Sequence, residues 1–363
     1  MFSTPRVSLS FCLPLALALL LGSGLPAPAA APAVAPWHDP ADRPWLERLV
    51  GHLARVNPAR LWPALDAGLT DAVVSLPSGS YRVRPRMGTP VDRIGGVAVP
   101  GLPTLRALPG VTVDREQLAT DRPWDVREIE GRPVHLLRLQ TRSARAVDEA
   151  LVAWMVGLFR YETQAAFRLT RPTDLGSGWL DDQDRALSRL EAEVLDRLLG
   201  EPEDRGVRAR QGAALFVALR KRHEESLPPR AADHMLSMTI LEGTARYLDT
   251  LVRQRVFQDR QAIARLRAEL RAPLPGDEGR FGLIGAAEAF VLDRWDPDWK
   301  RRFEQPIGSL EEVLAAVPAL AGETDGAAYL GGQDAVESRL EQLERAPVPA
   351  RSPGRLASPS ARP

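Results

Sequence analysis

The segment from Ala144 to Thr170 most constrains how this chain can fold. Its apolar residues recur at helical spacing, which predicts one long amphipathic helix. They are Val147, Leu151, Trp154, Met155, Leu158, Ala165 and Leu169. At about 100° per residue, Glu162 lies inside this apolar stripe, between Leu158 and Ala165. An ionised carboxylate is costly there unless something pairs with it, so Glu162 marks a special position.

Residues 1–31 have the pattern of a secretory signal peptide. Arg6 supplies a positive charge, and the apolar run from Phe11 to Leu21 is too short to span a bilayer comfortably. Small residues follow, and we expect cleavage near Ala29 to Ala33, which makes the mature protein secreted or periplasmic. The alternative is an uncleaved N-terminal anchor. The Pro-rich residues 32–44 are expected to form a linker.

The charge balance and the cysteine content exclude several classes of protein. Lys and Arg together number 47, as do Asp and Glu, and the two signs are interspersed. We therefore expect no nucleic acid or anionic surface as partner. The single cysteine, Cys12, lies in the signal segment, so the mature chain must be held by its core without disulfides. No later apolar run is long enough for a membrane span.

Residues 45–142 predict an N-terminal α/β region. Trp45–Leu53 reads as a short amphipathic helix that stops at Asn57-Pro58. Frequent Pro and Gly then separate short β-branched runs, which predicts a small irregular β-layer. These runs are Ala72–Val74, Tyr81–Val83, Val97–Val99, Val111–Val113 and Pro133–Leu139.

Residues 143–316 predict a helical domain, so the fold class is α+β but mostly α, with the β-layer packed on a helical bundle. After residues 144–170, helices are expected at 181–199, 207–225, 230–256, 263–270 and 281–295, and after a capping box at Ser309–Glu312. The centre of 230–256 is apolar nearly all round, which is typical of a helix buried on most sides. Residues 317–345 form a further helical segment, and residues 346–363 a disordered tail.

Two glutamates are candidates for chemistry because of their apolar surroundings. Besides Glu162, Glu242 lies in the apolar centre of its helix and precedes Gly243, which lets a backbone or a ligand approach closely. Buried carboxylates need a cation, donors or protons. The simpler alternative is that each pairs with one of the many arginines, such as Arg160, Arg220 or Arg246.

The histidines do not form a recognisable zinc-binding motif. Catalytic zinc usually takes two or three histidines with a carboxylate, and H-E-x-x-H is the helical solution. This motif does not occur in the chain. His223 lies in a run of charged residues, which predicts a solvated helix end, and His135 in a strand is more typical of packing than of a ligand.

The order of three elements resembles the zincin-like metallopeptidases of the gluzincin kind. In that family an H-E-x-x-H helix follows an edge strand, and a later E-G-x-A-x-Y-like helix supplies the third zinc ligand. Here Val134–Leu139 precedes Tyr161–Ala165, and Glu242–Tyr247 follows downstream. The resemblance covers roughly residues 134–314 and includes two further stretches, Gly285–Trp295 and Pro297–Lys300.

The resemblance implies a degenerate site. Glu162 matches the general base and Glu242 the third ligand, but Tyr161 and Ala165 replace the two histidines. Alanine cannot bind a metal, and one carboxylate with a tyrosine cannot form a tight tetrahedral zinc site. Glu162 would then be a remnant base without the zinc-bound water on which it acts.

Three hypotheses follow. The first is a secreted or periplasmic zincin-like protein without peptidase activity and without a cofactor, acting as a binding or structural module for a peptide or an envelope protein. In it, Glu162 and Glu242 face each other, with Arg or Tyr side chains in place of metal. The second is a zinc-dependent metallohydrolase in which His223 or His234 joins the two glutamates. The third is an unrelated helical envelope protein in which both glutamates are ordinary ion-pair partners.

Overall fold

The structure is a computed structural model of the whole chain, and it describes residues 41–346 with internal gaps. The longer gaps are 66–70, 86–110, 117–123, 170–179, 202–205, 303–308 and 321–324. The segment expected as a signal peptide (1–31), most of the expected linker and the run Val97–Val99 lie outside the described residues, as do residues 347–363 of the expected tail. The described residues belong to one compact unit.

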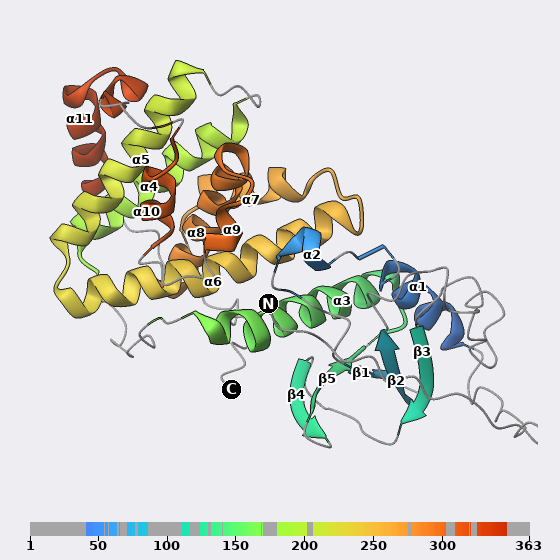
Figure 1. Cartoon of the computed structure of the whole chain (residues 1–363). Helices are drawn as coiled ribbons and strands as arrows, with labels where there is room; N and C mark the ends of the chain where they lie inside the picture. The colour runs from blue at the N-terminus through green and yellow to red at the C-terminus, as the bar shows by residue number, and fades with distance from the viewer. Residues whose placement is uncertain are drawn as a thin grey trace, which may run out of the picture. The chain divides into compact units, whose positions relative to one another are not determined.

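A five-stranded mixed sheet forms the N-terminal part of this unit (Figure 1). Its strands are β1 (Asp71–Leu76), β2 (Gly79–Pro85), β3 (Val111–Glu116), β4 (Trp124–Ile129) and β5 (Arg132–Arg138), in the order β3-β2-β1-β5-β4. β1 and β5 are parallel, and the other pairs are antiparallel. The sequence missed β4, because its apolar residues Trp124, Val126 and Ile129 do not alternate regularly.

The helices largely confirm the periodicity of the sequence. They are α1 (Arg43–Leu53), α2 (Pro58–Leu61), α3 (Ala144–Leu158), α4 (Asp182–Gly200), α5 (Val207–Ser226), α6 (Pro229–Arg255), α7 (Ala262–Arg271), α8 (Asp277–Trp295), α9 (Trp299–Arg302), α10 (Leu310–Ala315) and α11 (Gln333–Glu344). The mostly α, α+β class with a small N-terminal sheet is therefore confirmed. α1 begins inside the segment expected as a linker, whereas Asp181 and Ser309 cap α4 and α10 as their residue types predict.

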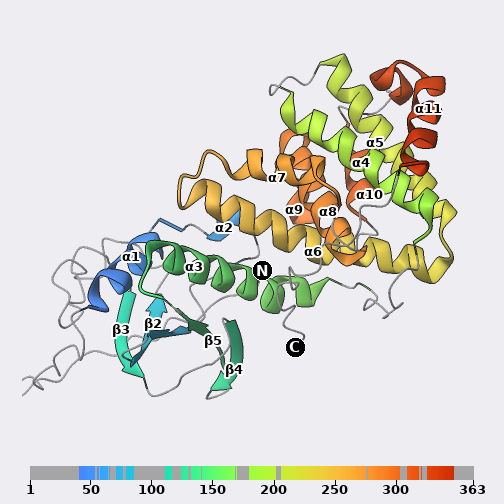
Figure 2. The same ribbon diagram turned by 180° about the vertical axis from the view of Figure 1, so that it is seen from behind.

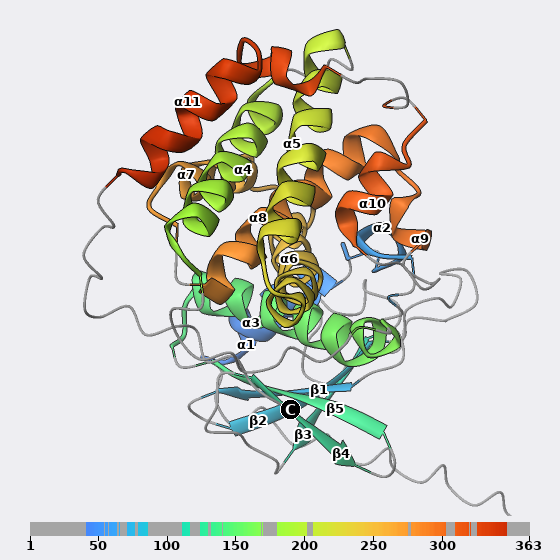
Figure 3. The same cartoon turned by 90° about the vertical axis from the view of Figure 1, so that its left-hand side faces the viewer.

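Helix α6 lies at the centre of the described core. It packs against α3 on one side and along α8 on another, and α8 in turn contacts α4. α3 contacts β4 and β5, so it separates the sheet from α6, as Figures 2 and 3 show. The prediction that α6 is buried on most sides is confirmed by buried residues all around its centre.

The close approach of α6 and α8 explains Gly243. A Cβ built on Gly243 would lie 2.7 Å from the Cα of Gly285, so any side chain there would collide with the backbone of α8. The sequence allowed either a second backbone or a ligand beside Gly243, and the structure places the backbone of α8 there. Small residues at this crossing let the two backbones touch directly.

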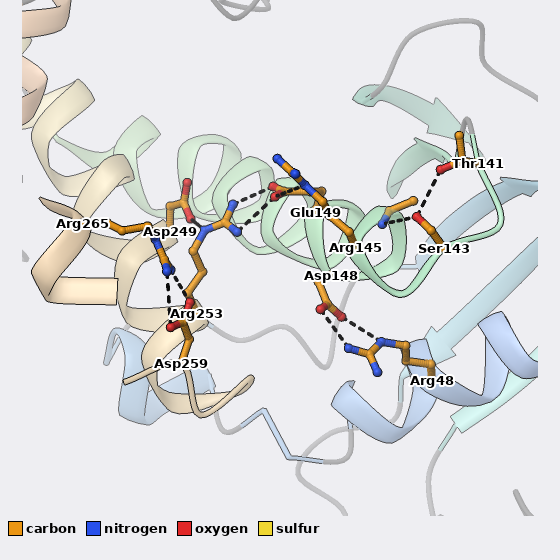
Figure 4. Close-up of polar contacts among 11 residues, drawn as sticks. Arg48, Thr141, Ser143, Arg145, Asp148, Glu149, Asp249, Arg253, Asp259 and Arg265 are labelled. Carbon is orange, nitrogen blue, oxygen red and sulfur yellow. Dashed lines mark hydrogen bonds and ion pairs between the residues drawn. The ribbon is translucent and has the colours of Figure 1, made fainter. Parts of the chain in front are cut away.

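Two neighbouring acidic residues fix α3 to the helices beside it (Figure 4). Asp148 accepts hydrogen bonds from Arg48 of α1, at 3.0 and 2.9 Å, and lies 2.9 Å from His52 Nε2. Glu149 accepts hydrogen bonds from Arg253 of α6, at 3.1 and 2.6 Å. Successive residues of a helix point in different directions, which lets this pair hold partners on two sides.

Candidate functional site

The helix predicted over residues 144–170 ends earlier than expected. The α-helical pattern stops at Leu158, a π-helical turn follows over Phe159–Thr163, and one 3-10 turn covers Gln164–Ala166. Phe167 is then extended. The prediction of one continuous helix is wrong from Phe159 onwards, because a wider turn breaks the 3.6-residue period on which it depends.

Contacts with α6 fix the π turn. Both terminal nitrogens of Arg160 donate to the carboxylate of Glu242, at 2.9 and 2.6 Å. The side-chain amide of Gln164 donates to Leu241 O at 2.6 Å and to Thr244 Oγ1 at 2.9 Å. Together these bonds attach both ends of the turn to one stretch of α6. Such tertiary contacts override local periodicity, and a sequence window cannot reveal them.

The structure places the predicted site residues as follows. Tyr161 is 49% exposed, and Ala165 is also exposed, so its expected position on the apolar stripe is wrong. The π turn changes the direction in which the side chains after Leu158 point, compared with the directions that a continuous α-helix would give them. The side chain of Glu162 lies outside the described residues, so its expected meeting with Glu242 stays a prediction. Glu242 itself pairs with an arginine, which is the simpler of the alternatives stated above.

The zinc ion that the resemblance implies does not fit the residues around Glu242. Both oxygens of Glu242 accept hydrogen bonds from Arg160, and that guanidinium stands where a cation would be. Ala165 offers no donor atom. Within the part of the chain that the structure describes, no group of three or more His, Cys, Asp or Glu residues could hold a metal ion.

The alternative ligands are not brought to Glu242. His223 is fully buried and its Nδ1 lies 2.9 Å from Glu191 Oε1, so the expectation of a solvated helix end is wrong. The reason is that His223 helps to satisfy a carboxylate buried between α4 and α5. His234 lies eight residues before Glu242 on α6, which is about 12 Å along the helix axis.

A second site, which the sequence analysis missed, lies among α4, α5, α8 and α10. We call it the buried ionic cluster, and it consists of Glu191, Arg220, His223, Glu288 and Glu311. All five side chains are buried, and four of them are completely so. Such a concentration of ionisable groups in a core is uncommon, because each charge loses its hydration there.

Arg220 is the centre of the buried ionic cluster. Its Nη1 donates to Glu191 Oε2 at 3.1 Å, its Nη2 donates to Thr239 Oγ1, and its Nε lies 3.6 Å from Glu311 Oε1. Neither carboxyl oxygen of Glu288 has a hydrogen-bond partner among the described residues. One guanidinium therefore faces three carboxyl groups.

These contacts divide the carboxyl groups into two kinds. Burial by itself would raise the pKa of Glu191, but the charges and hydrogen bonds of Arg220 and His223 hold it below its usual range. Burial raises the pKa of Glu288 well above its usual range, and the neighbouring Glu311 adds to this effect. Burial also raises the pKa of Glu311. Glu191 is thus the ionised partner of Arg220, and the other two favour their protonated forms.

The sequence did contain a signal for part of this cluster. Glu288 lies inside the otherwise apolar run Phe281–Leu292, which is the pattern that singled out Glu242. Glu191 and Arg220 carried no such signal, because each lies in a helix with many charged residues. Only the packing of α4 on α5 shows that these two face the core.

A third polar centre joins three stretches of the resemblance, which are Glu242–Tyr247, Gly285–Trp295 and Pro297–Lys300. Tyr247 donates its hydroxyl proton to Asp293 Oδ2, and Trp299 Nε1 donates to Asp293 Oδ1 at 2.8 Å. Lys300 Nζ lies 3.0 Å from the same Oδ1 and 4.9 Å from the centre of the Tyr247 ring. Burial lowers the pKa of Lys300. Because three donors satisfy Asp293, this centre is a structural link between α6, α8 and α9.

No protein-family model matches the chain, and no curated protein or solved structure shows significant similarity to it. In the described ranges, none of the helices is both long enough and apolar enough to cross a bilayer.

Proposed function

We propose that this chain is a secreted or periplasmic protein of zincin-like architecture that lacks zinc peptidase activity and acts as a binding or structural module. The observation that carries the proposal is the pairing of Arg160 with Glu242 at 2.9 and 2.6 Å. An arginine on the residue that matches the third zinc ligand supplies a positive charge without a metal. Tyr161 and Ala165 stand where the family has its two zinc-binding histidines, which is consistent with a guanidinium in place of the metal ion.

The geometry of the pair explains why metal chemistry is disfavoured. A planar guanidinium matches a carboxylate through two parallel hydrogen bonds, and this arrangement is among the strongest charge-assisted contacts. A metal could use Glu242 only after this pair had separated. Even then, the position of Ala165 would supply no ligand, and Tyr161 is directed largely to solvent.

The arrangement of the sheet supports the zincin-like part of the proposal. β5 leads directly into α3, as a strand leads into the active-site helix in the family, although β5 lies inside the described sheet, whose edge strands are β3 and β4. Trp124 at the start of β4 lies against Gly157 in the last turn of α3, where a Cβ would come within 2.3 Å of its ring. The edge strand therefore begins beside the π turn.

A binding role is supported by the surface at this junction. Tyr161 and Val207 are the large hydrophobic residues exposed among those described, and Tyr161 adjoins the Arg160–Glu242 pair, of which about a third is exposed. An extended peptide can add to an exposed sheet edge through main-chain hydrogen bonds, with side-chain contacts providing specificity. Among the described residues β4 pairs with β5 alone, and we assign its outer edge and Tyr161 to these two kinds of contact.

Two measurements test the proposal. The mature protein, purified and then supplied with zinc, should retain no stoichiometric metal and should not cleave peptide libraries. A chelator-sensitive peptidase activity that Glu162→Gln abolishes would overturn it. Selection of peptides on the immobilised protein should give binders that Tyr161→Ala weakens at least fivefold, whereas the matched change Val207→Ala leaves them unaffected.

The same ion pair also fits an unrelated helical envelope protein in which Glu242 is an ordinary salt-bridge partner. That alternative predicts no peptide binders sensitive to Tyr161, because nothing would then link the π turn to a binding role. The peptide selection therefore separates the two proposals, while the metal measurement separates both from a metallohydrolase.

A further inference from the structure

We propose that the buried ionic cluster is a pH-sensitive latch, which holds α10 against α5 and α8 while Glu288 and Glu311 are protonated and releases α10 when they ionise. The proposal is independent of the proposed binding role, which uses none of these residues. The latch consists of α10 (Leu310–Ala315) and the cluster beneath it.

The first support is the geometry around Arg220. Its side chain is completely buried, and its Nη1 is engaged by Glu191 on α4 at 3.1 Å. Its Nε lies 3.6 Å from Glu311 on α10, which is longer than a hydrogen bond. Arg220 is thus hydrogen-bonded to Glu191 and still attracts Glu311, so a single guanidinium is shared among several carboxyl groups.

The second support is the position of Glu288. It lies in the middle of α8, is completely buried, and has no hydrogen-bond partner for either oxygen among the described residues. The charged groups that act on it are Glu311 of α10, Arg220 of α5 and Glu191 of α4. A carboxylate in such surroundings would be stabilised by one shared cation and opposed by two neighbouring carboxyl groups.

The charge count gives the direction of the switch. With Glu288 and Glu311 protonated, the pair of Arg220 and Glu191 is neutral, and His223 binds Glu191 from the other side at 2.9 Å. Ionisation of both acids adds two negative charges inside the core. Glu191 and Glu224 also act on Glu311 and oppose its ionisation. Asp184 lies 4.0 Å from His223 Nε2, on the far side of that ring from Glu191.

The release should occur at α10, because this helix is the least anchored element of the cluster. It has six residues, while α4, α5 and α8 have 19 or 20. α8 packs along α6 in the centre of the core, and α10 contacts only α5 and α8 among its major neighbours. Moving α10 relieves the repulsion by carrying Glu311 to solvent, at the expense of exposing Leu310, Val313 and Leu314, which are buried while α10 is docked.

The sign follows from the raised pKa values of Glu288 and Glu311. A carboxyl group whose pKa is raised in the closed state stabilises that state below the pKa of the open state. The stabilisation is lost as the pH rises through the closed-state pKa. The latch is therefore held most firmly in acid, below the ordinary carboxyl pKa, and it weakens as the pH rises.

The test uses thiol labelling of the full chain, with Cys12→Ser to remove the natural thiol. Val313→Cys places a buried thiol on the inner face of α10, and Ala315→Cys places an exposed thiol on the same helix. The ratio of their labelling rates cancels the pH dependence of thiol ionisation. We expect the buried thiol to gain at least tenfold relative to the exposed one between pH 5, close to the ordinary carboxyl pKa, and pH 9.5.

Three further variants decide the mechanism. Glu288→Gln and Glu311→Gln, each tested separately, should reduce the tenfold gain to less than threefold, because fewer charges can develop. Glu312→Gln, an exposed neighbour on α10, should behave as the parent protein. A constant ratio in the parent protein would overturn the proposal. So would an unchanged tenfold gain in both glutamine variants, and the second variant decides the case if the first does not fold.

Discussion

The two terminal nitrogens of Arg160 donate to the two carboxyl oxygens of Glu242, which joins the π turn to α6. About a third of each side chain is exposed, at 35% and 33%, so water screens the pair. We expect Arg160→Ala to lower the free energy of unfolding by about 1 kcal/mol. Urea titration checks this value. The exposed pair Lys221–Glu225 provides the control, because Lys221→Ala should change stability by less than about 0.5 kcal/mol. Equal effects would show that the π turn does not depend on Arg160.

Two glycine substitutions should have opposite effects on stability, one at the crossing of α6 and α8 and one in an open position of α1. Gly243→Ala introduces a Cβ 2.7 Å from Gly285 Cα, and we expect it to destabilise the fold by about 1–3 kcal/mol through overpacking. Gly51→Ala lies within α1 and meets nothing within 4 Å, so it should stabilise the fold by about 0.5–1 kcal/mol. Thermal or urea unfolding of both variants measures the contrast. Equal signs would mean that the helices separate more easily than their packing indicates.

Trp154 is completely buried on the inner face of α3. Trp154→Ala should cost on the order of 3–5 kcal/mol, because it removes a large aromatic side chain and leaves a cavity. Tyr161→Ala, two turns further along the chain, should stay within about 0.5 kcal/mol of the parent protein, since Tyr161 is exposed. Differential scanning calorimetry distinguishes the two. An unchanged melting temperature for Trp154→Ala would place the core on another face of α3.

His135 predicts loss of stability in acid. It is completely buried in β5, and burial lowers its pKa to about 4. Its Nδ1 accepts a hydrogen bond from Trp124 at 3.3 Å, which requires the neutral ring. Because the folded state disfavours the protonated form, stability is full above pH 6.5 and falls towards pH 4, by on the order of 3 kcal/mol. His135→Leu should flatten this part of the stability curve, measured by urea titration at several pH values. A parallel curve would assign the acid sensitivity to other groups.

Asp148 and Glu149 are adjacent on α3 but differ in their surroundings. Asp148 is the more buried, at 21% against 46% exposure, and it holds both Arg48 and His52 of α1. Asp148→Ala should therefore cost about 1–3 kcal/mol, whereas Glu149→Ala should cost less than about 1 kcal/mol. Hydrogen exchange of α1 gives an independent readout, because only Asp148→Ala should increase exchange there. Increased exchange in both variants would mean that α1 depends on α3 as a whole.

The fold followed from the sequence wherever local periodicity and burial coincide. The helices at 182–200, 207–226 and 229–255 were predictable, because caps and prolines mark their ends and apolar residues recur along them. β5 was predictable for the same reason. The π turn was not, because the bonds of Arg160 and Gln164 to α6 join residues about 80 positions apart in the sequence.

The candidate sites were less predictable than the fold. Glu242 was found because a charge among apolar residues is visible in a single helix. His223 was misjudged, because the charged residues around it hide the fact that its own side chain points inwards to Glu191. Sequence patterns report the average polarity of a helix face, whereas a buried polar network depends on which two faces meet.

One turn of α6 takes part in both the Arg160–Glu242 pair and the buried ionic cluster. Thr239 accepts a hydrogen bond from Arg220 of the buried ionic cluster, and Glu242 accepts hydrogen bonds from Arg160. Gly243, the next residue, packs directly against α8. A shift of this turn changes the distances in both sites at once. Substitutions at the two sites should therefore show epistasis, and evolution could alter one of them only within the limits set by the other.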